Sequence, residues 1–235
     1  MYYHYGYYMD PTYILVLIGL VLTLLASGMV NSTYAKYERI RSSAGMTGAD
    51  VARRILLNAG ITDVQVVHTH GRLTDNYNPS KRTVFLSDAT YNSTSVAAIG
   101  VAAHECGHAV QHDVGYVPLQ IRSALVPVAT IGSHAGIPLI ILGVLMSYNQ
   151  TLITIGIWAF SLAVLFQLVT LPVEFNASRR ALVMLDEQRI LDPAELKGSR
   201  SVLRAAAMTY VAAAAASILQ LLRLVLIFGG GRRRD

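Results

Sequence analysis

The chain has 235 residues, of which 53% are hydrophobic and only 14% are charged. Soluble domains carry about 25% charged residues, so this composition excludes an ordinary soluble protein and an intrinsically disordered one. The single cysteine, Cys106, excludes a disulfide scaffold. The net charge of +5 comes partly from arginines that flank apolar runs, so it does not indicate a nucleic-acid partner. The sequence therefore predicts a mainly α-helical membrane protein.

Four apolar runs are long enough to cross a bilayer, which takes about 20 residues of helix. The predicted spans cover residues 13–30, 123–146, 152–171 and 205–228. Only a short polar break separates the second span from the third, so we expect these two to form a helical hairpin. The first run lacks the basic start and the cleavage site of a secretory signal, which indicates an uncleaved anchor.

The basic residues predict how the spans are oriented, because lysines and arginines collect in cytoplasmic loops. Residues 31–122 and 173–204 are rich in them, whereas the hairpin tip and the tyrosine-rich residues 1–10 contain none. The two basic regions are therefore expected on the cytoplasmic side, with the N-terminus and the hairpin tip outside. Four spans would then place the arginine triplet at 232–234 outside, which conflicts with the rule and leaves the side of the C-terminus open.

Residues 46–122 lie between the first two spans and are predicted to form a small cytoplasmic α+β region. An amphipathic helix begins after Thr47 and ends near Gly60, which suits a left-handed C-cap. Strands at 64–67 and 82–86 are expected to pair as a hairpin, because a turn-rich segment joins them. A second helix follows and leads into the membrane. The chain is expected to be one membrane-embedded unit over residues 1–235.

An H-E-x-x-H motif occupies residues 104–108, inside an alanine-rich predicted helix at about 93–112. Residues four positions apart share one helix face, so His104 and His108 can bind the same ion. Zinc accepts imidazole nitrogen readily, and a catalytic zinc site keeps one position open for water. Glu105 can contact that water and act as the general base. The motif predicts a hydrolytic site with one Zn²⁺ ion.

The third zinc ligand must come from elsewhere in the chain. Val114 stands where metzincins have their third histidine, so that class is excluded. His112 continues the same helix face, but one straight helix cannot easily surround a tetrahedral ion with three successive turns. Glu174 is the better candidate, because two membrane crossings return the chain to the side it left and this residue follows the third span. Two histidines and a glutamate form a known catalytic zinc site.

Four segments keep their order along most of the chain: residues 73–79 (LTDNYNP), 84–87 (VFLS), 102–111 (AAHECGHAVQ) and 171–181 (LPVEFNASRRA). In these segments the sequence resembles a family, the YugP-type membrane zinc metallopeptidases, and more loosely the HtpX-like peptidases. The resemblance implies that His104, His108 and Glu174 bind zinc and that Glu105 is the catalytic base.

The residues expected around the zinc ligands are less closely defined. HtpX-like enzymes commonly have an aspartate four residues after the ligand glutamate, where this chain has Ser178, with Asn176 nearby. Ser178, Asn176 and His112 are therefore candidates for orienting the ligands. Arg179 and Arg180 are candidates for stabilising the oxyanion of the reaction. The segment Thr83–Ser87 is a candidate edge strand for binding a peptide.

These features predict a membrane-bound zinc metalloendopeptidase of the gluzincin type in the cell membrane, with its active site at the cytoplasmic surface. Its expected partners are the lipid bilayer and protein or peptide substrates that are membrane-associated, and no nucleic acid. Two alternatives remain open. One is intramembrane cleavage, as in site-2-type proteases, and the other is a non-catalytic membrane scaffold with a structural zinc ion.

Overall fold

The computed structural model describes residues 10–229. The arginine triplet and most of the tyrosine-rich start lie outside the described residues. The chain divides into two compact units. The apolar unit contains residues 10–25, 126–167 and 212–229, and the site unit contains Ala26–Leu125 and Leu168–Val211.

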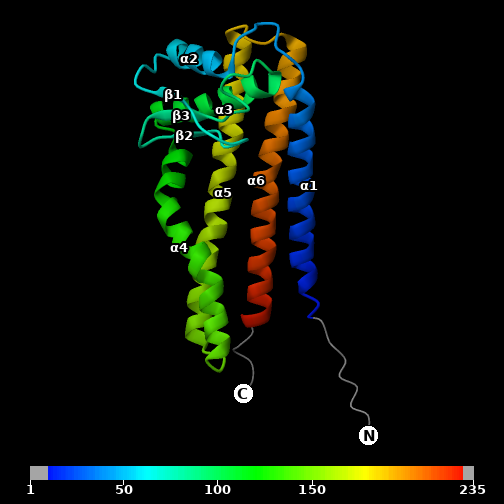
Figure 1. Cartoon of the computed structure of the whole chain (residues 1–235). Coiled ribbons are helices and arrows are strands. Elements are labelled where there is room, and N and C mark those ends of the chain that lie inside the picture. The colour runs from blue at the N-terminus through cyan, green and yellow to red at the C-terminus, as the bar shows by residue number, and fades with distance from the viewer. Residues whose placement is uncertain (1–9, 230–235) are drawn as a thin grey trace. The chain divides into compact units, whose positions relative to one another are not determined.

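Four helices of the described chain are long and apolar enough to cross a membrane. They are α1 (Tyr13–Glu38), α4 (Val117–Leu145), α5 (Gln150–Glu187) and α6 (Pro193–Phe228). This confirms the predicted fold class, a mainly helical membrane protein with four spans and a small α+β region (Figure 1). Each of these helices is longer than its predicted apolar run, because residues next to the run are helical as well.

Helix α5 continues beyond residue 171, where the third span was expected to end. It passes through Pro172 without a break and carries Glu174 as part of the same helix. A proline removes one backbone hydrogen bond, and packing of the flanking turns can hold the helix together. Here the flanking turns are held by a stripe of fully buried residues at four-residue spacing, Val173, Ala177, Ala181 and Leu185.

Small residues let the helices of the apolar unit approach closely. A side chain at Gly132 of α4 would meet the backbone carbonyl of Ala159 on α5, and a side chain at Gly19 of α1 would meet Ala216 of α6. Membrane helices associate through such close backbone packing, because lipid tails leave no hydrophobic force to drive them together. These small residues thus allow α4 to pack closely against α5, and α1 against α6, within this unit.

The site unit contains a three-stranded sheet in the order β1-β3-β2. Its strands are β1 (Gln65–His68), β2 (Asn76–Asn78) and β3 (Thr83–Leu86). Strands β1 and β3 are parallel, and β2 is antiparallel to β3. The expected hairpin between residues 64–67 and 82–86 is therefore wrong, and the hairpin is formed by β2 and β3.

The reason lies in the turn-rich segment, which reverses the chain twice. Gly71 and Leu73 have positive φ angles of 110° and 58° before β2, and Arg82 has a φ of 46° before β3. The segment between these reversals is long enough to form the extra strand β2. Because β3 lies in the middle of the sheet, Thr83–Ser87 is not an edge strand, and the free edges belong to β1 and β2.

Two amphipathic helices pack against each other and against the sheet (Figure 1). Helix α2 (Gly48–Asn58) begins at a capping box, in which Thr47 and Asp50 each accept a hydrogen bond from the backbone of the other. Gly60 has a φ of 75° just beyond its end, as predicted. Helix α3 (Val96–Asp113) begins at the N-cap Ser95, whose hydroxyl accepts a hydrogen bond from the backbone of Ala98.

Gly107 positions α3 against α5. A Cβ atom at this residue would lie 2.5 Å from the carbonyl oxygen of Ala177, which leaves no room for any other side chain. Ala103 and Cys106 of α3 are fully buried in the same core as Ala181. The small residues of α3 thus bring the backbone of the motif helix into direct contact with the helix that carries Glu174.

Candidate metal centre

The two motif histidines lie one turn apart on α3 with their rings in contact. The ring centroids of His104 and His108 are 4.7 Å apart in an edge-to-face arrangement. His108 is buried and His104 is partly exposed. The helical four-residue step therefore produces the shared face that the motif predicts.

Glu174 of α5 closes this group. Its Oε2 atom lies 3.2 Å from Nε2 of His104 and 3.6 Å from Nε2 of His108. The side chain is almost completely buried. Residues 70 positions apart in the chain thus meet at one point, as the there-and-back passage of α4 and α5 predicts.

The geometry of the three residues suits zinc. A tetrahedral zinc ion with bonds of about 2.0–2.2 Å holds neighbouring ligand atoms about 3.3–3.6 Å apart. The two His–Glu separations, 3.2 and 3.6 Å, lie just below this range and at its upper end, and the ligand atoms of all three residues lie within 4.8 Å of one another. Imidazole nitrogen and carboxylate oxygen are also the donor types that catalytic zinc prefers. Among the described residues, this group can hold a metal ion.

Each histidine is oriented by a hydrogen bond at its other ring nitrogen. Nδ1 of His104 lies 3.2 Å from the hydroxyl of Ser178, and Nδ1 of His108 lies 3.0 Å from Oε1 of Gln111. When Nδ1 donates its proton to such a partner, the lone pair of Nε2 is left free for a metal. The Gln111 oxygen can only accept, so it favours the tautomer of His108 that ligation requires, and the Ser178 hydroxyl can accept the Nδ1 proton of His104 in the same way.

Gln111 is itself held in place by α5. Its Nε2 donates to the backbone oxygen of Val173 at 2.8 Å and to Oδ1 of Asn176 at 3.0 Å. The same Asn176 oxygen accepts a hydrogen bond of 2.8 Å from Nε of Arg180. Both the oxygen and the nitrogen of the buried Gln111 amide therefore have hydrogen-bond partners. Gln111 links Asn176 to His108 and so helps to fix the orientation of this histidine.

Arg122, at the start of α4, contacts the other oxygen of Glu174. Its Nη1 atom lies 3.4 Å from Oε1, while Oε2 faces the two histidines. The guanidinium is half-buried, so its attraction for the carboxylate is screened less than at the surface. This contact orients Glu174 so that one oxygen is directed at the histidines.

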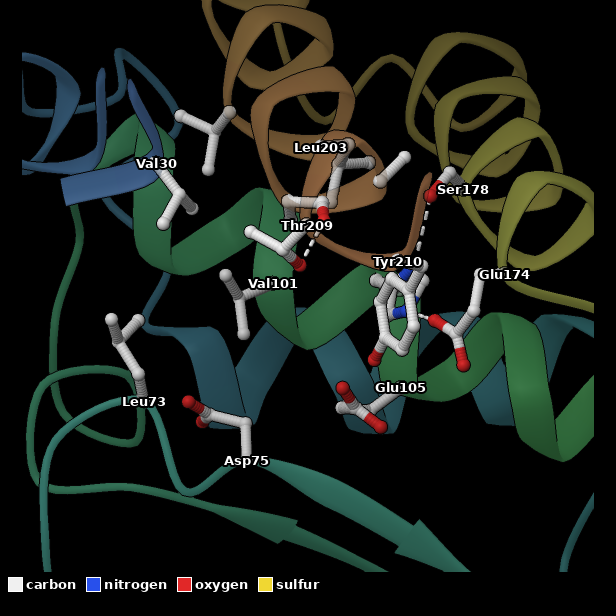
Figure 2. A pocket seen from close by; sticks show the side chains of 14 residues that line it. Val30, Leu73, Asp75, Val101, Glu105, Glu174, Ser178, Leu203, Thr209 and Tyr210 are labelled. Atoms are coloured by element: carbon white, nitrogen blue, oxygen red, sulfur yellow. Dashed lines mark hydrogen bonds and ion pairs between the residues drawn. The ribbon is translucent and has the colours of Figure 1, made fainter. Parts of the chain in front are cut away.

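Glu105 projects from the next position of α3 into a cavity beside the three residues (Figure 2). Only 7% of the residue is exposed. Burial raises the pKa of the Glu105 carboxyl, and the nearby carboxylates of Glu174 and Asp75 act in the same direction, against the histidines. A carboxylate with a raised pKa is a stronger base, which is the property that proton abstraction from water requires.

The cavity has a volume of about 240 Å³ and two different walls. One wall carries the polar side chains of Asp75, His104, Glu105, Glu174, Ser178, Thr209 and Tyr210. The other wall is apolar and is formed by Val30, Leu73, Val101, Val202, Leu203, Ala206 and Ala207. Helices α1, α3 and α6 and the segment before β2 all contribute to it, so the cavity depends on the tertiary fold.

The structure does not bring every candidate residue to this cavity. The Nδ1 atom of His112 lies 2.8 Å from the hydroxyl of Tyr77, and this histidine lines a separate hollow. Arg180 is engaged with Asn176, and Arg179 is exposed. Neither arginine lines the cavity. Cys106 is also excluded from chemistry, because burial raises the pKa of its thiol.

Four residues at this centre were not among the site residues expected from the sequence: Gln111, Arg122, Asp75 and Tyr210. Gln111 lies three positions after His108, on the same helix face, and could have been found from that spacing. Arg122 is one of the basic residues in 31–122, whose number indicates the orientation of the spans and does not single out any one of them. Tyr210 is a polar residue in an alanine-rich apolar run, which is itself a signal of a functional position.

The Ser178→Ala exchange tests the orientation of His104. It removes only the hydroxyl, and we expect the affinity for zinc to fall by roughly 10- to 100-fold, as is usual for such partners. Affinity is measured by competition with a chelating dye. Ser201→Ala is the control, because this hydroxyl bonds only to its own helix at Lys197. Equal affinities in both variants would show that the Ser178 contact does not hold the ligand.

Comparison with known proteins agrees with the geometry of this centre. A protein-family model described as "Putative neutral zinc metallopeptidase" matches residues 12–229. The chain is 45% identical over 218 residues to the "Putative membrane protease YugP" of Bacillus subtilis (strain 168), covering 93% of this chain and 96% of the relative. No solved structure matches the chain. The expected zinc cofactor is thus confirmed by the family description together with a residue group able to hold a metal ion, and the chain belongs to this family of zinc metallopeptidases.

Proposed function

We propose that the protein is a membrane-bound zinc metalloendopeptidase of the gluzincin type. His104, His108 and Glu174 hold the zinc ion, and Glu105 is the general base. The observation that carries this proposal is the meeting of Glu174 with both motif histidines at 3.2 and 3.6 Å, beside a cavity into which Glu105 projects. A bound zinc ion supplies a Lewis acid that activates water and polarises a carbonyl group.

The residues of the chain then perform the proton transfers. Glu105 accepts a proton from the attacking water while the water oxygen forms a bond to the carbonyl carbon. As the carbon–nitrogen bond breaks, its electron pair goes to the amine nitrogen, which takes the proton from Glu105.

The apolar wall of the cavity favours substrates with an aliphatic side chain next to the cleaved bond. Val101 of α3 and Ala206 of α6 form this wall beside the polar one. Ala206 belongs to a helix that is apolar enough to cross the membrane. These features support membrane-associated or partly unfolded peptides as the substrates, because such chains expose apolar residues.

A free sheet edge lies next to the cavity. Asp75 and Leu73 line the cavity and directly precede β2, whose outer edge is unpaired in the described sheet. Asp75 is fixed by hydrogen bonds of 2.8 and 2.9 Å from the backbone and hydroxyl of Ser87. A peptide added as a strand along β2 would therefore enter the cavity in an ordered register. Strand β2 is therefore proposed as the peptide-binding strand in place of β3, which lies in the middle of the sheet.

Two observations count against the alternatives. Helix α3, which carries the motif, is not among the helices of the described chain that can cross a membrane, so intramembrane cleavage of the site-2 type is disfavoured. Glu105 faces a cavity instead of completing a closed coordination shell, and a structural zinc site leaves no such open position.

Metal removal tests the proposed reaction. We expect 1,10-phenanthroline to abolish hydrolysis of β-casein by the detergent-purified protein, because the activated water depends on the ion. Dialysis followed by one equivalent of Zn²⁺ per chain should restore it, and metal analysis should then give one zinc per chain. Hydrolysis that persists in a metal-free preparation would contradict the proposal.

The active site is placed on the cytoplasmic side in this proposal. The support is the excess of lysine and arginine in the two regions that carry the site residues, compared with the hairpin tip at residues 146–149, which has none. Alkaline phosphatase inserted at the tip should be active, because it needs an oxidising compartment for its disulfides. A fluorescent protein inserted at residues 188–192 should fold in the cytoplasm. The opposite pattern would reverse the orientation.

A further inference from the structure

Peptide hydrolysis requires a hydrogen-bond donor for the oxygen that becomes negatively charged when water attacks the carbonyl group. The arginines expected in this role do not reach the cavity, since Arg180 is bound to Asn176 and Arg179 is exposed. The donor must therefore be found among the side chains that line the cavity in the described structure.

Elimination leaves one candidate. The Ser178 hydroxyl is bound to Nδ1 of His104, the ring nitrogen directed away from the proposed zinc ion, and the hydroxyl of Thr209 donates to the backbone oxygen of Ala206 at 2.6 Å. Asp75 and Glu105 are carboxylates, which accept hydrogen bonds when ionised. Among the described residues that line the cavity, Tyr210 is the remaining side chain with a hydrogen to donate.

Tyr210 is placed where such a donor is needed. It lies on α6, across the cavity from α3, and its side chain points into the cavity between Glu105 and Glu174 (Figure 2). Glu105 and Glu174 line the same cavity on either side of it. The phenol is therefore beside both the proposed general base and the proposed ligand group.

We propose that Tyr210 is a catalytic residue that donates a hydrogen bond to the oxyanion of the reaction. This inference rests on the proposed peptidase function. When the water oxygen bonds to the carbonyl carbon, the π electron pair moves to the carbonyl oxygen, and the Tyr210 hydroxyl donates a hydrogen bond to this oxygen. The phenol keeps its proton throughout. When the carbon–nitrogen bond breaks, the carbonyl double bond re-forms and the hydrogen bond weakens.

A role limited to holding Glu174 is the alternative explanation of the position of Tyr210 in this cavity. Arg122 already orients that carboxylate through its other oxygen, and the histidines face the remaining one. The two roles predict different results. A donor to the oxyanion affects the transition state alone, whereas a residue that orients a ligand affects the affinity for zinc.

The test compares wild type with Tyr210→Phe, which removes only the hydroxyl. We expect zinc content and zinc affinity to be unchanged, and kcat on β-casein to fall by about 10²- to 10³-fold, as when one oxyanion donor is removed. The affinity of a phosphinic peptide, built on a bond that the wild type cleaves, should fall by a comparable factor in calorimetry. KM should change little. Tyr210→His retains a donor and should recover part of kcat.

Matched variants keep the outcomes distinct. Tyr91→Phe removes a hydroxyl that bonds to the exposed Arg53, away from the cavity, and should hydrolyse at the wild-type rate. Loss of zinc in Tyr210→Phe, or an unchanged kcat, would overturn the role proposed for Tyr210. Glu105→Gln separates this from the peptidase function itself. If Glu105→Gln is inactive while Tyr210→Phe is fully active, only the role of Tyr210 fails.

Discussion

The Glu105→Gln variant is expected to bind one zinc ion per chain and to have lost nearly all hydrolysis. Glutamine has the shape of glutamate, so the packing of α3 and the positions of His104 and His108 should be preserved. It cannot accept a proton from water, and removal of a general base costs about 10²- to 10⁴-fold in rate. Burial raises the pKa of Glu105, so a neutral amide in the same place should not lower the stability. Rate and zinc content are measured on the same preparation.

Glu187→Gln is the matched control for this exchange. Glu187 is exposed at the end of α5, so the same chemical change there should leave the rate unaffected. Full activity in Glu105→Gln would require another base and would remove the mechanism proposed for this cavity. Loss of zinc together with activity would show instead that Glu105 supports the metal group.

The second large effect is expected from Glu174→Ala. This exchange deletes a proposed ligand and leaves His104, His108 and Arg122 facing an empty site. Zinc affinity should fall by more than the roughly 10- to 100-fold that is typical of partners outside the ligand set. Because Arg122 loses the partner of its half-buried charge, the melting temperature should fall as well.

Glu174→Gln separates these two effects. It keeps an oxygen and the volume of the side chain but loses the negative charge, so we expect weaker zinc binding with a smaller loss of stability than in Glu174→Ala. Glu187→Ala, on the same helix, controls for truncation of a glutamate. A normal zinc load and normal hydrolysis in Glu174→Ala would exclude Glu174 as a ligand and would break the link between α3 and α5 on which the proposal depends.

The metal centre shows how one short motif depends on several distant segments. Ser178, Gln111 and Arg122 each hold one of the three proposed ligands, and they come from α5, α3 and α4. Buried polar groups need such partners, because an unpaired donor or acceptor is costly in a low-dielectric interior. Exchange of any one of them should therefore affect the metal more than the overall fold.

The features of this protein that depend on local pattern could be predicted from its residues alone. Apolar runs of about 20 residues specify membrane helices whatever their neighbours are, and the four-residue spacing of His104 and His108 specifies a shared helix face. Even the meeting with Glu174 was predictable, because two crossings return the chain to the side it left. The N-cap of α3 and the glycine after α2 followed from residue type.

Three features depend instead on packing between distant segments: the strand order, the continuation of α5 through Pro172, and the side chains that surround the proposed ligands. A turn-rich segment does not reveal by its composition that it contains β2, because short strands gain their stability from pairing with distant residues. Arg179, Arg180 and Arg122 are alike as basic flanking residues, and the rotation and contacts of each helix decide which of them meets Glu174. Tyr210 reaches the cavity for the same reason: packing of α6, and not its own sequence pattern, directs its hydroxyl there.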